Sequence, residues 1–155
     1  MELELDLDAG AMRDIADELC RCLADTFVVY MKTLSFHWNV EGPNFPQLHK
    51  LFQKQYEGLA GSVDTIAERI RALGEVAPCC ARDLIDMSNL QETDEVPDAL
   101  SMVRILKEDH ENICRNLRSV IKLAQDEGDD ASVNMLSGLL EGHEKTAWML
   151  RVTAS

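Results

Sequence analysis

The sequence predicts an all-α protein, built as a four-helix bundle in which one long crossover joins two helical hairpins. Apolar residues recur at spacings of three and four along four long segments, which is the periodicity of one helix face. Leu, Ala, Met, Glu and Asp are plentiful and aromatic residues make up only 5% of the chain, a composition that favours helices over strands. The connections within each pair of segments are short, and residues 75–96 form the long connection between the pairs.

The first two helices are expected on either side of Gly42-Pro43-Asn44, where the chain must turn. The second helix is predicted to begin near Pro46, with Asn44 as its N-cap, and to end at Gly74. The apolar face of the first helix consists of Ile15, Leu19, Leu23, Phe27, Tyr30, Leu34 and His37. That of the second consists of Leu48, Phe52, Tyr56, Leu59, Val63, Ile66, Ile70 and Leu73.

The third helix is predicted to begin at Pro97 and to end at Gly128, and Asp129-Asp130 are expected to cap the fourth. The apolar face of the third helix consists of Leu100, Val103, Leu106, His110, Ile113, Leu117 and Val120. The matching face of the fourth consists of Val133, Leu136, Leu140, His143, Ala147 and Leu150.

The lengths of the connections predict the topology. Short connections make the helices of each pair antiparallel neighbours, and a helix of about 25 to 30 residues is about 40 Å long. Residues 75–96 can span that length, with Leu84–Met87 forming a short helical turn on the way. Two hairpins joined by one long crossover are the ferritin-like arrangement. An ordinary four-helix bundle with an unstructured loop remains an alternative.

Charge and composition exclude several classes of protein. The net charge of −13 is expected to repel nucleic acid and anionic membranes and to attract cations. No apolar run approaches the roughly 20 residues of a membrane span, and residues 1–8 lack the basic and apolar regions of a signal peptide. Five cysteines without a CxxC pair indicate reduced thiols. We expect one cytoplasmic domain over residues 1–155, with an acidic tail at residues 1–10.

Four residues form a candidate metal site: His37, His49, Asp64 and Glu68. Each has an ordinary explanation when taken alone. His37 continues an apolar helix face, and Asp64 and Glu68 have the spacing of a solvated helix face. Their joint placement is more informative than any one of them, because His49, Asp64 and Glu68 lie in one row of the second helix. The complete row is His49, Gln53, Glu57, Ala60, Asp64 and Glu68.

The geometry of that row requires two chains. His49 and Asp64 are separated by about 22 Å along a straight helix, so they cannot bind one metal within one chain. The small side chains around Gly58–Gly61 would let a second, antiparallel copy of the helix approach closely. Such a crossing brings His49 of one chain towards Asp64 and Glu68 of the other. Two imidazoles and two carboxylates suit iron or zinc and do not choose between them.

These segments closely resemble the Dps family, the mini-ferritins of bacteria. The resemblance covers nearly the whole chain after about residue 12. It implies a homo-oligomeric, dodecameric shell with ferroxidase centres at its two-fold interfaces, each with two histidines from one subunit and the Asp and Glu from its neighbour. It also implies iron oxidation by hydrogen peroxide, or by oxygen, and storage of ferric mineral that protects against oxidative damage. The resemblance rests on Phe36-His37-Trp38-Asn39-Val40, Gly42, Asn44-Phe45, His49, Asp64-Thr65-Ile66-Ala67-Glu68-Arg69, Leu73-Gly74 and His143–Leu150.

Two further positions bear on the function that the resemblance implies. Gln53 stands where the family commonly has an Asp that supports a second iron, and an amide is the poorer ligand, so we expect that second position to be weak. The family forms a pore for iron near the start of the last helix. Asp130 is the strongest candidate there, although helix capping would explain it as well. The weaker pore candidates are Asp126, Glu127 and Asp129.

Specific residues distinguish this function from its alternatives. A ferritin or di-iron oxygenase needs Glu-x-x-His pairs, which the sequence lacks, so His110 and His143 are interpreted as core or interface residues. A DNA-compacting structural protein of the same family is the alternative function. It requires several basic contacts to phosphate, whereas residues 1–10 carry four acids and no base, so DNA binding is not expected. An assembly module with a degenerate site is disfavoured because all four ligands are present. Trp38, beside His37, is expected to pack at an interface or to donate electrons near the site.

Overall fold

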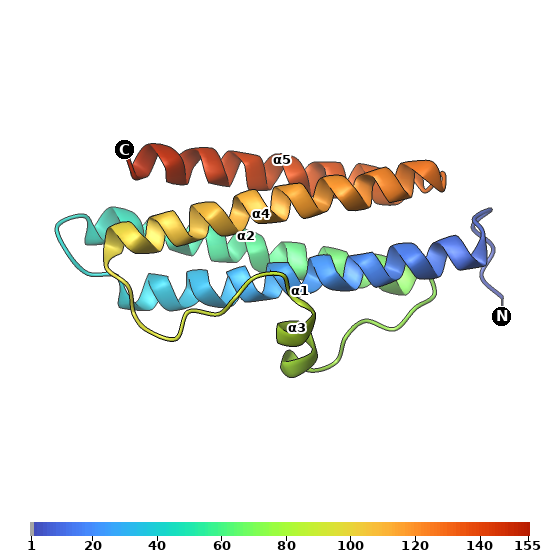
Figure 1. The fold of residues 1–155 in the computed structure, drawn as a ribbon, viewed down its shortest axis with the longest axis horizontal. Coiled ribbons are helices and arrows are strands. Elements are labelled where there is room, and N and C mark those ends of the chain that lie inside the picture. Colours follow the sequence, from blue (N-terminus) through green and yellow to red (C-terminus); the bar gives the residue numbers. More distant parts are fainter. Residues whose placement is uncertain (1) are drawn as a thin grey trace.

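The computed structural model describes residues 2–155 and shows four long helices and one short helix, with no strand among these residues (Figure 1). The predicted all-α bundle is therefore confirmed. The helices are α1 (Ala9–Asn39), α2 (Phe45–Ala72), α3 (Ala81–Met87), α4 (Ala99–Asp126) and α5 (Asp130–Thr153).

The helices form two antiparallel hairpins, α1 with α2 and α4 with α5. After α2 the chain returns along the outside of α1 to the end of the bundle where α4 begins, and α3 packs against α1 on the way (Figure 1). The crossover is thus a structured part of the bundle. The C-terminus and the α1–α2 loop lie at one end of the molecule, and the α4–α5 turn lies at the other.

Aspartate side chains begin three of the long helices. Asp8, Asp98 and Asp129 each accept a hydrogen bond from the backbone N–H three residues further on, which satisfies one of the free donors of a helix N-terminus. Because Asp8 caps α1, that helix begins at Ala9, inside the acidic tail expected over residues 1–10. Asn44 holds the N-cap position of α2 without a side-chain capping bond, so there the first-turn Pro46 is the stronger start signal.

The apolar faces predicted from periodicity meet in the centre of the bundle. Burying each large aliphatic or aromatic side chain there contributes about 1.5–3 kcal/mol to folding. Leu100 departs from the prediction and is 42% exposed, since it lies in the first turn of α4 at the end of the bundle. The most deeply buried large side chains include Ile15, Leu19, Phe52, Ile66, Ile70, Leu73, Met102, Leu106, Leu136 and Leu150.

Asp25 of α1 fastens the crossover to the bundle. Its buried carboxylate accepts hydrogen bonds from the Ser88 hydroxyl at 2.8 Å and from the Asn89 backbone N–H at 2.7 Å. The amide of Asn116 on α4 donates to the same carboxylate at 3.0 Å. One buried side chain therefore joins α1, α4 and the segment that follows α3.

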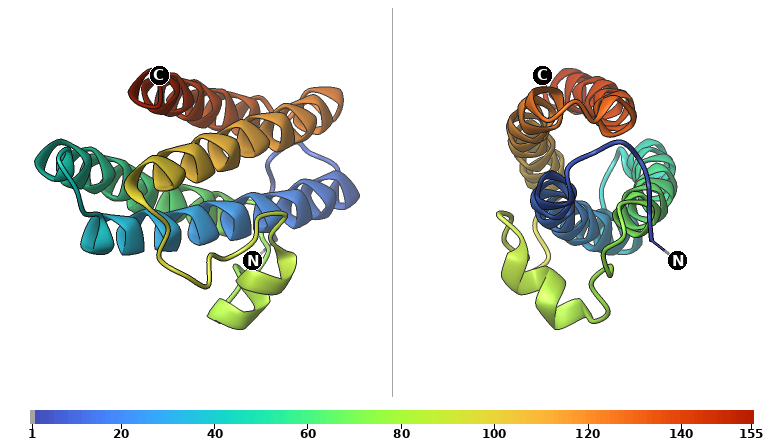
Figure 2. Two further views of the ribbon diagram at one scale, coloured as in Figure 1. Left: turned by 60° about the vertical axis from the view of Figure 1, so that its left-hand side comes forward. Right: turned by 90° about the vertical axis from the view of Figure 1, so that its right-hand side faces the viewer.

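The four long helices do not pack evenly. α1 lies against both α2 and α4, and α4 lies against α5, whereas α2 and α5 barely touch. In the end-on view, α2 and α5 form the side of the bundle opposite the α1–α4 contact (Figure 2). Within residues 2–155, no helix has both the length and the apolar character that crossing a membrane would need.

Candidate metal centre

His37 and His49 lie against each other where α1 ends and α2 begins. Their rings are stacked, with centroids 3.8 Å apart and planes inclined by 13°. The His37 Nδ1 lies 2.7 Å from the carbonyl oxygen of His49, and the His49 Nδ1 lies 2.8 Å from the carbonyl oxygen of His37. Because a carbonyl oxygen can only accept, each Nδ1 carries a proton and donates it.

These reciprocal bonds fix the tautomer of both neutral imidazoles. With Nδ1 protonated, the neutral ring keeps a lone pair on Nε2, the atom that binds a metal. Metal-binding histidines usually donate their other ring N–H to a carbonyl or carboxylate in this way. Aromatic neighbours hold the rings in place, since Tyr56 meets His37 edge-on at 5.2 Å and Phe45 lies 5.0 Å from His49. Within one chain, therefore, both imidazoles have their Nδ1 atoms hydrogen-bonded and, in the neutral form, a lone pair on Nε2.

Asp64 and Glu68 lie one turn apart and exposed on the same helix, α2, towards its other end. Among residues 2–155, neither carboxylate forms a salt bridge. Because α2 runs unbroken from Phe45 to Ala72, the separation of about 22 Å between His49 and Asp64 applies directly. In the described chain, no three His, Cys, Asp or Glu residues lie close enough to hold a metal. A centre made from these four residues therefore requires a second chain.

Gln53 lies exposed one turn after His49 on α2. Its amide nitrogen donates to the Glu57 carboxylate at 3.0 Å. The amide oxygen is then the only atom that Gln53 can offer to a metal, and it carries no formal charge. Gln53 therefore brings no negative charge to this position of α2.

The acids at the start of α5 have different surroundings. Asp130 is exposed in the first turn. Asp129 is buried, accepts from the Arg69 guanidinium at 2.7 Å and caps α5 through the Ser132 N–H at 3.0 Å. Arg69 also donates to the Ser132 hydroxyl at 2.9 Å, which ties the end of α2 to the start of α5. Asp129 is therefore a buried structural residue, whereas Asp130 faces solvent.

The chain matches the family described as "Ferritin-like domain" over residues 16–154. It is 41% identical over 131 residues to an uncharacterised low temperature-induced protein of Nostoc, covering 83% of this chain and 73% of that relative. It is 33% identical over 139 residues to DNA protection during starvation protein 2 of Bacillus anthracis, covering 90% of this chain and 95% of the relative.

The crystal structure of a Dps protein from Vibrio cholerae has a TM-score of 0.95 to this fold, at 28% identity and covering 100% of this chain and 98% of that one. That protein is described as a member of a broad superfamily of ferritin-like diiron-carboxylate proteins. The ferritin-like arrangement expected from the crossover is thereby confirmed. The chain belongs to the Dps family of ferritin-like proteins.

Proposed function

We propose that this protein oxidises Fe²⁺ at centres shared between two subunits and stores the ferric product as mineral inside a dodecameric shell. The observation that carries the proposal is the reciprocal hydrogen bonding of His37 and His49, which prepares two Nε2 atoms for a metal. Membership of the ferritin-like family supports iron as that metal. Members of this fold hold iron with carboxylates and histidines.

The second half of each centre comes from a neighbouring subunit. An antiparallel α2 crossing near Gly58 and Gly61 would present its Asp64 and Glu68 to the histidines of the first chain. A Cβ atom added at either glycine would meet nothing within 4 Å, so no contact within one chain requires a glycine there, although Gly58 also lines the space between α2 and α5. Close approach of a second helix does account for them.

The ligand set suits oxidation as well as binding. Fe²⁺ is the substrate, and it gains one positive charge when it loses its electron. The carboxylates of Asp64 and Glu68 supply two negative charges beside the metal, which stabilise the ferric ion more than the ferrous ion. Each hydrogen peroxide molecule accepts two electrons and so oxidises two ferrous ions. The ferric ions then leave for the mineral, and the centre can bind Fe²⁺ again.

Stopped-flow absorbance of the ferric product tests this function. Iron oxidation should be faster with hydrogen peroxide than with oxygen at equal oxidising equivalents, and Asp64→Asn should lose most of the rapid phase. Asp83→Asn removes an exposed acid on α3 and should match the wild type. A rapid phase that survives Asp64→Asn would contradict the centre, and an equal or faster reaction with oxygen would contradict the choice of oxidant.

A further inference from the structure

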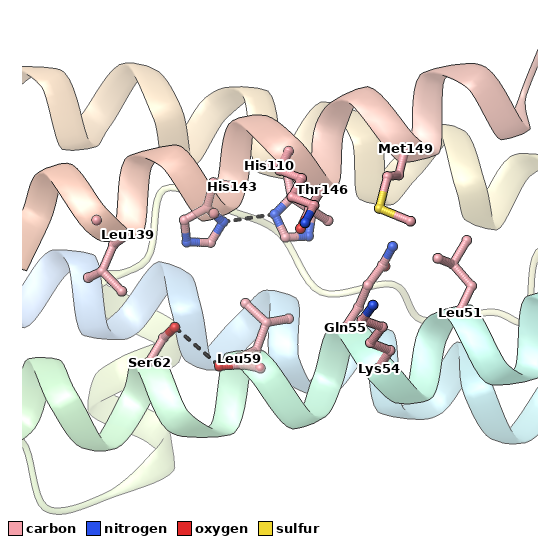
Figure 3. A pocket seen from close by; sticks show the side chains of 14 residues that line it. Leu51, Lys54, Gln55, Leu59, Ser62, His110, Leu139, His143, Thr146 and Met149 are labelled. Carbon is pink, nitrogen blue, oxygen red and sulfur yellow. Dashed lines mark hydrogen bonds between the residues drawn. The ribbon is translucent and has the colours of Figure 1, made fainter.

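A pocket of about 280 Å³ lies between α2 and α5, on the side of the bundle where these helices barely touch. Figure 3 shows side chains of α2 and α5 facing each other across it, with His110 and His143 together on one side. Its lining is mainly apolar. Leu51 and Leu59 contribute from α2, and Leu139 and Met149 contribute from α5. None of the four proposed metal ligands lines this pocket, although Gly58, at the proposed two-fold crossing, does.

Buried polar atoms without partners lie in this pocket. His110 is 1% exposed, and its Nε2 has no hydrogen-bond partner among residues 2–155. The amide nitrogen and oxygen of Gln55 are also buried and unpaired, and the side chain rises from α2 towards α5 (Figure 3). Each buried, unpaired polar group costs about 1–3 kcal/mol. A ligand that brought hydrogen-bonding groups to these atoms would recover that cost.

The two histidines form a neutral pair. The Nδ1 atoms of His110 and His143 are 2.8 Å apart, so one ring donates to the other. Burial lowers the pKa of His143 to about 4 and holds the pKa of His110 well below its ordinary value. At neutral pH the ring that donates through Nδ1 has a lone pair on Nε2, and its partner has an Nε2–H. Together the pair offers one acceptor and one donor.

We propose that this pocket binds a small, neutral aromatic molecule that carries a hydroxyl group, a phenol being the simplest case. An apolar cavity of about 150 Å³ holds benzene in another protein, so this larger pocket accommodates one substituted ring. The ring packs against the leucine and methionine side chains. The hydroxyl group can donate to an imidazole Nε2 or to the Gln55 carbonyl and can accept from the Gln55 amide, which satisfies atoms that the chain leaves unpaired.

The charges around the pocket favour a neutral ligand over an anion. Lys54 and Lys145 also line the pocket, and both residues are exposed to solvent. An exposed ion pair contributes only about 0–1 kcal/mol. A carboxylate placed beside the neutral imidazoles and Gln55 would lose its hydration without a buried partner charge. That desolvation penalty is larger than the attraction of the exposed lysines. No acidic or cysteine side chain lines the pocket to balance a metal ion.

Two glycines keep the pocket open. Gly138 and Gly142 lie one turn apart on α5 and line it, and a Cβ atom added to either would meet nothing within 4 Å. A glycine inside a helix costs about 1 kcal/mol relative to alanine. Larger residues at these positions therefore narrow the pocket without threatening the helix, which makes them suitable probes.

Titration calorimetry of the assembled, iron-free protein with 4-bromophenol tests the proposal, together with crystals soaked in the same compound. We expect one molecule per chain, with its bromine located by anomalous scattering between α2 and α5. Bromobenzene, which lacks the hydroxyl group, should bind about tenfold more weakly, the loss of one buried hydrogen bond. Gln55→Leu should lower the affinity for 4-bromophenol and leave that for bromobenzene unchanged or raised.

Gly142→Leu should abolish binding, whereas Ser137→Leu, at an exposed position of α5 outside the pocket, should retain it. Equal affinity for bromobenzene, tighter binding of 4-bromobenzoate, undiminished binding by Gly142→Leu, or no binding at millimolar concentration would each overturn the proposal. These measurements use no iron. Failure of the ferroxidase proposal would therefore leave their outcome unaffected.

Discussion

At the scale of single residues, the buried histidines couple the stability of the fold to pH. Burial lowers the pKa of His143 from 6.5 to about 4, and burial together with the neighbouring His143 holds the pKa of His110 well below 6.5. As pH falls from 6.5 towards 4, these histidines therefore become protonated in the unfolded chain but stay neutral in the folded chain. The free energy of unfolding is therefore unaffected by these histidines above pH 6.5 and decreases as pH falls from 6.5 towards 4. For His143 alone the loss amounts to roughly 3 kcal/mol by about pH 4.

His143→Gln should flatten this dependence, because glutamine keeps a hydrogen-bonding partner for His110 but does not titrate. Urea unfolding of iron-free protein at fixed pH values between 7 and 4.5 would measure the free energy of unfolding of both forms. The wild type should lose more stability than the variant over this range. Parallel losses in the two proteins would mean that His143 is as accessible to protons in the folded chain as in the unfolded one.

The burial of other polar residues could not be predicted from the sequence. Lys32 of α1 and Asp109 of α4 form a buried ion pair at 2.9 Å, and burial raises the pKa of Asp109 against the opposing effect of Lys32. The periodicity of apolar residues predicts which face of a helix is buried. A lysine is ordinarily predicted to be exposed to solvent. The stacking of His37 on His49 likewise depends on backbone carbonyl groups that no side-chain pattern reveals.

At the scale of helices, most of the architecture could be predicted. Long amphipathic segments and their breakers locate a helix well, because burial of one face dominates its stability. The first and last residues of each helix were predicted less accurately. The third long helix begins after Asp98, which caps it, and not at Pro97. The path of residues 75–96 depends on tertiary bonds to Asp25, so its packing against α1 could not be read from local sequence.

Asp25→Ala should loosen the crossover while α1 remains helical. The change leaves the donors of Ser88, Asn89 and Asn116 without their acceptor, and a hydrogen bond to a charged group is worth about 1.5–3 kcal/mol. Hydrogen exchange should speed up across residues 80–92 by tenfold or more, relative to the wild type. Asp86→Ala, an exposed acid on α3, serves as the control. Unchanged exchange in Asp25→Ala would show that α3 is held by its apolar contacts alone.

At the scale of the whole molecule, net charge distinguishes the proposed iron oxidation and storage from the alternative function, DNA compaction. The net charge is −13, and the segment before α1 carries exposed Glu2, Glu4, Asp6 and Asp8. Purified protein should therefore leave plasmid DNA unshifted in gels at neutral pH and moderate salt. Magnesium must be varied separately, because divalent ions can bridge two polyanions. Retardation that weakens steeply with added salt would show that the assembled surface presents basic residues to DNA.

The central claim is that each centre takes its histidines from one chain and its carboxylates from another. His49→Ala and Asp64→Asn should each lose most rapid iron oxidation as homo-oligomers, since every centre then lacks one ligand. When the two variants are unfolded and refolded together, each mixed two-fold dimer has one intact centre. That centre takes its histidines from the Asp64→Asn chain and its carboxylates from the His49→Ala chain.

Mixing His49→Ala with Asp64→Asn, with subunit exchange confirmed by native mass spectrometry, is the most direct test. About half of the dimers should be mixed, so about a quarter of the wild-type rate should return. Mixing His49→Ala with His37→Ala is the matched control and should restore nothing, because both defects lie in the histidine half of the centre. Recovery in the first mixture alone is the result predicted here. No recovery at any ratio would contradict a centre shared between two chains.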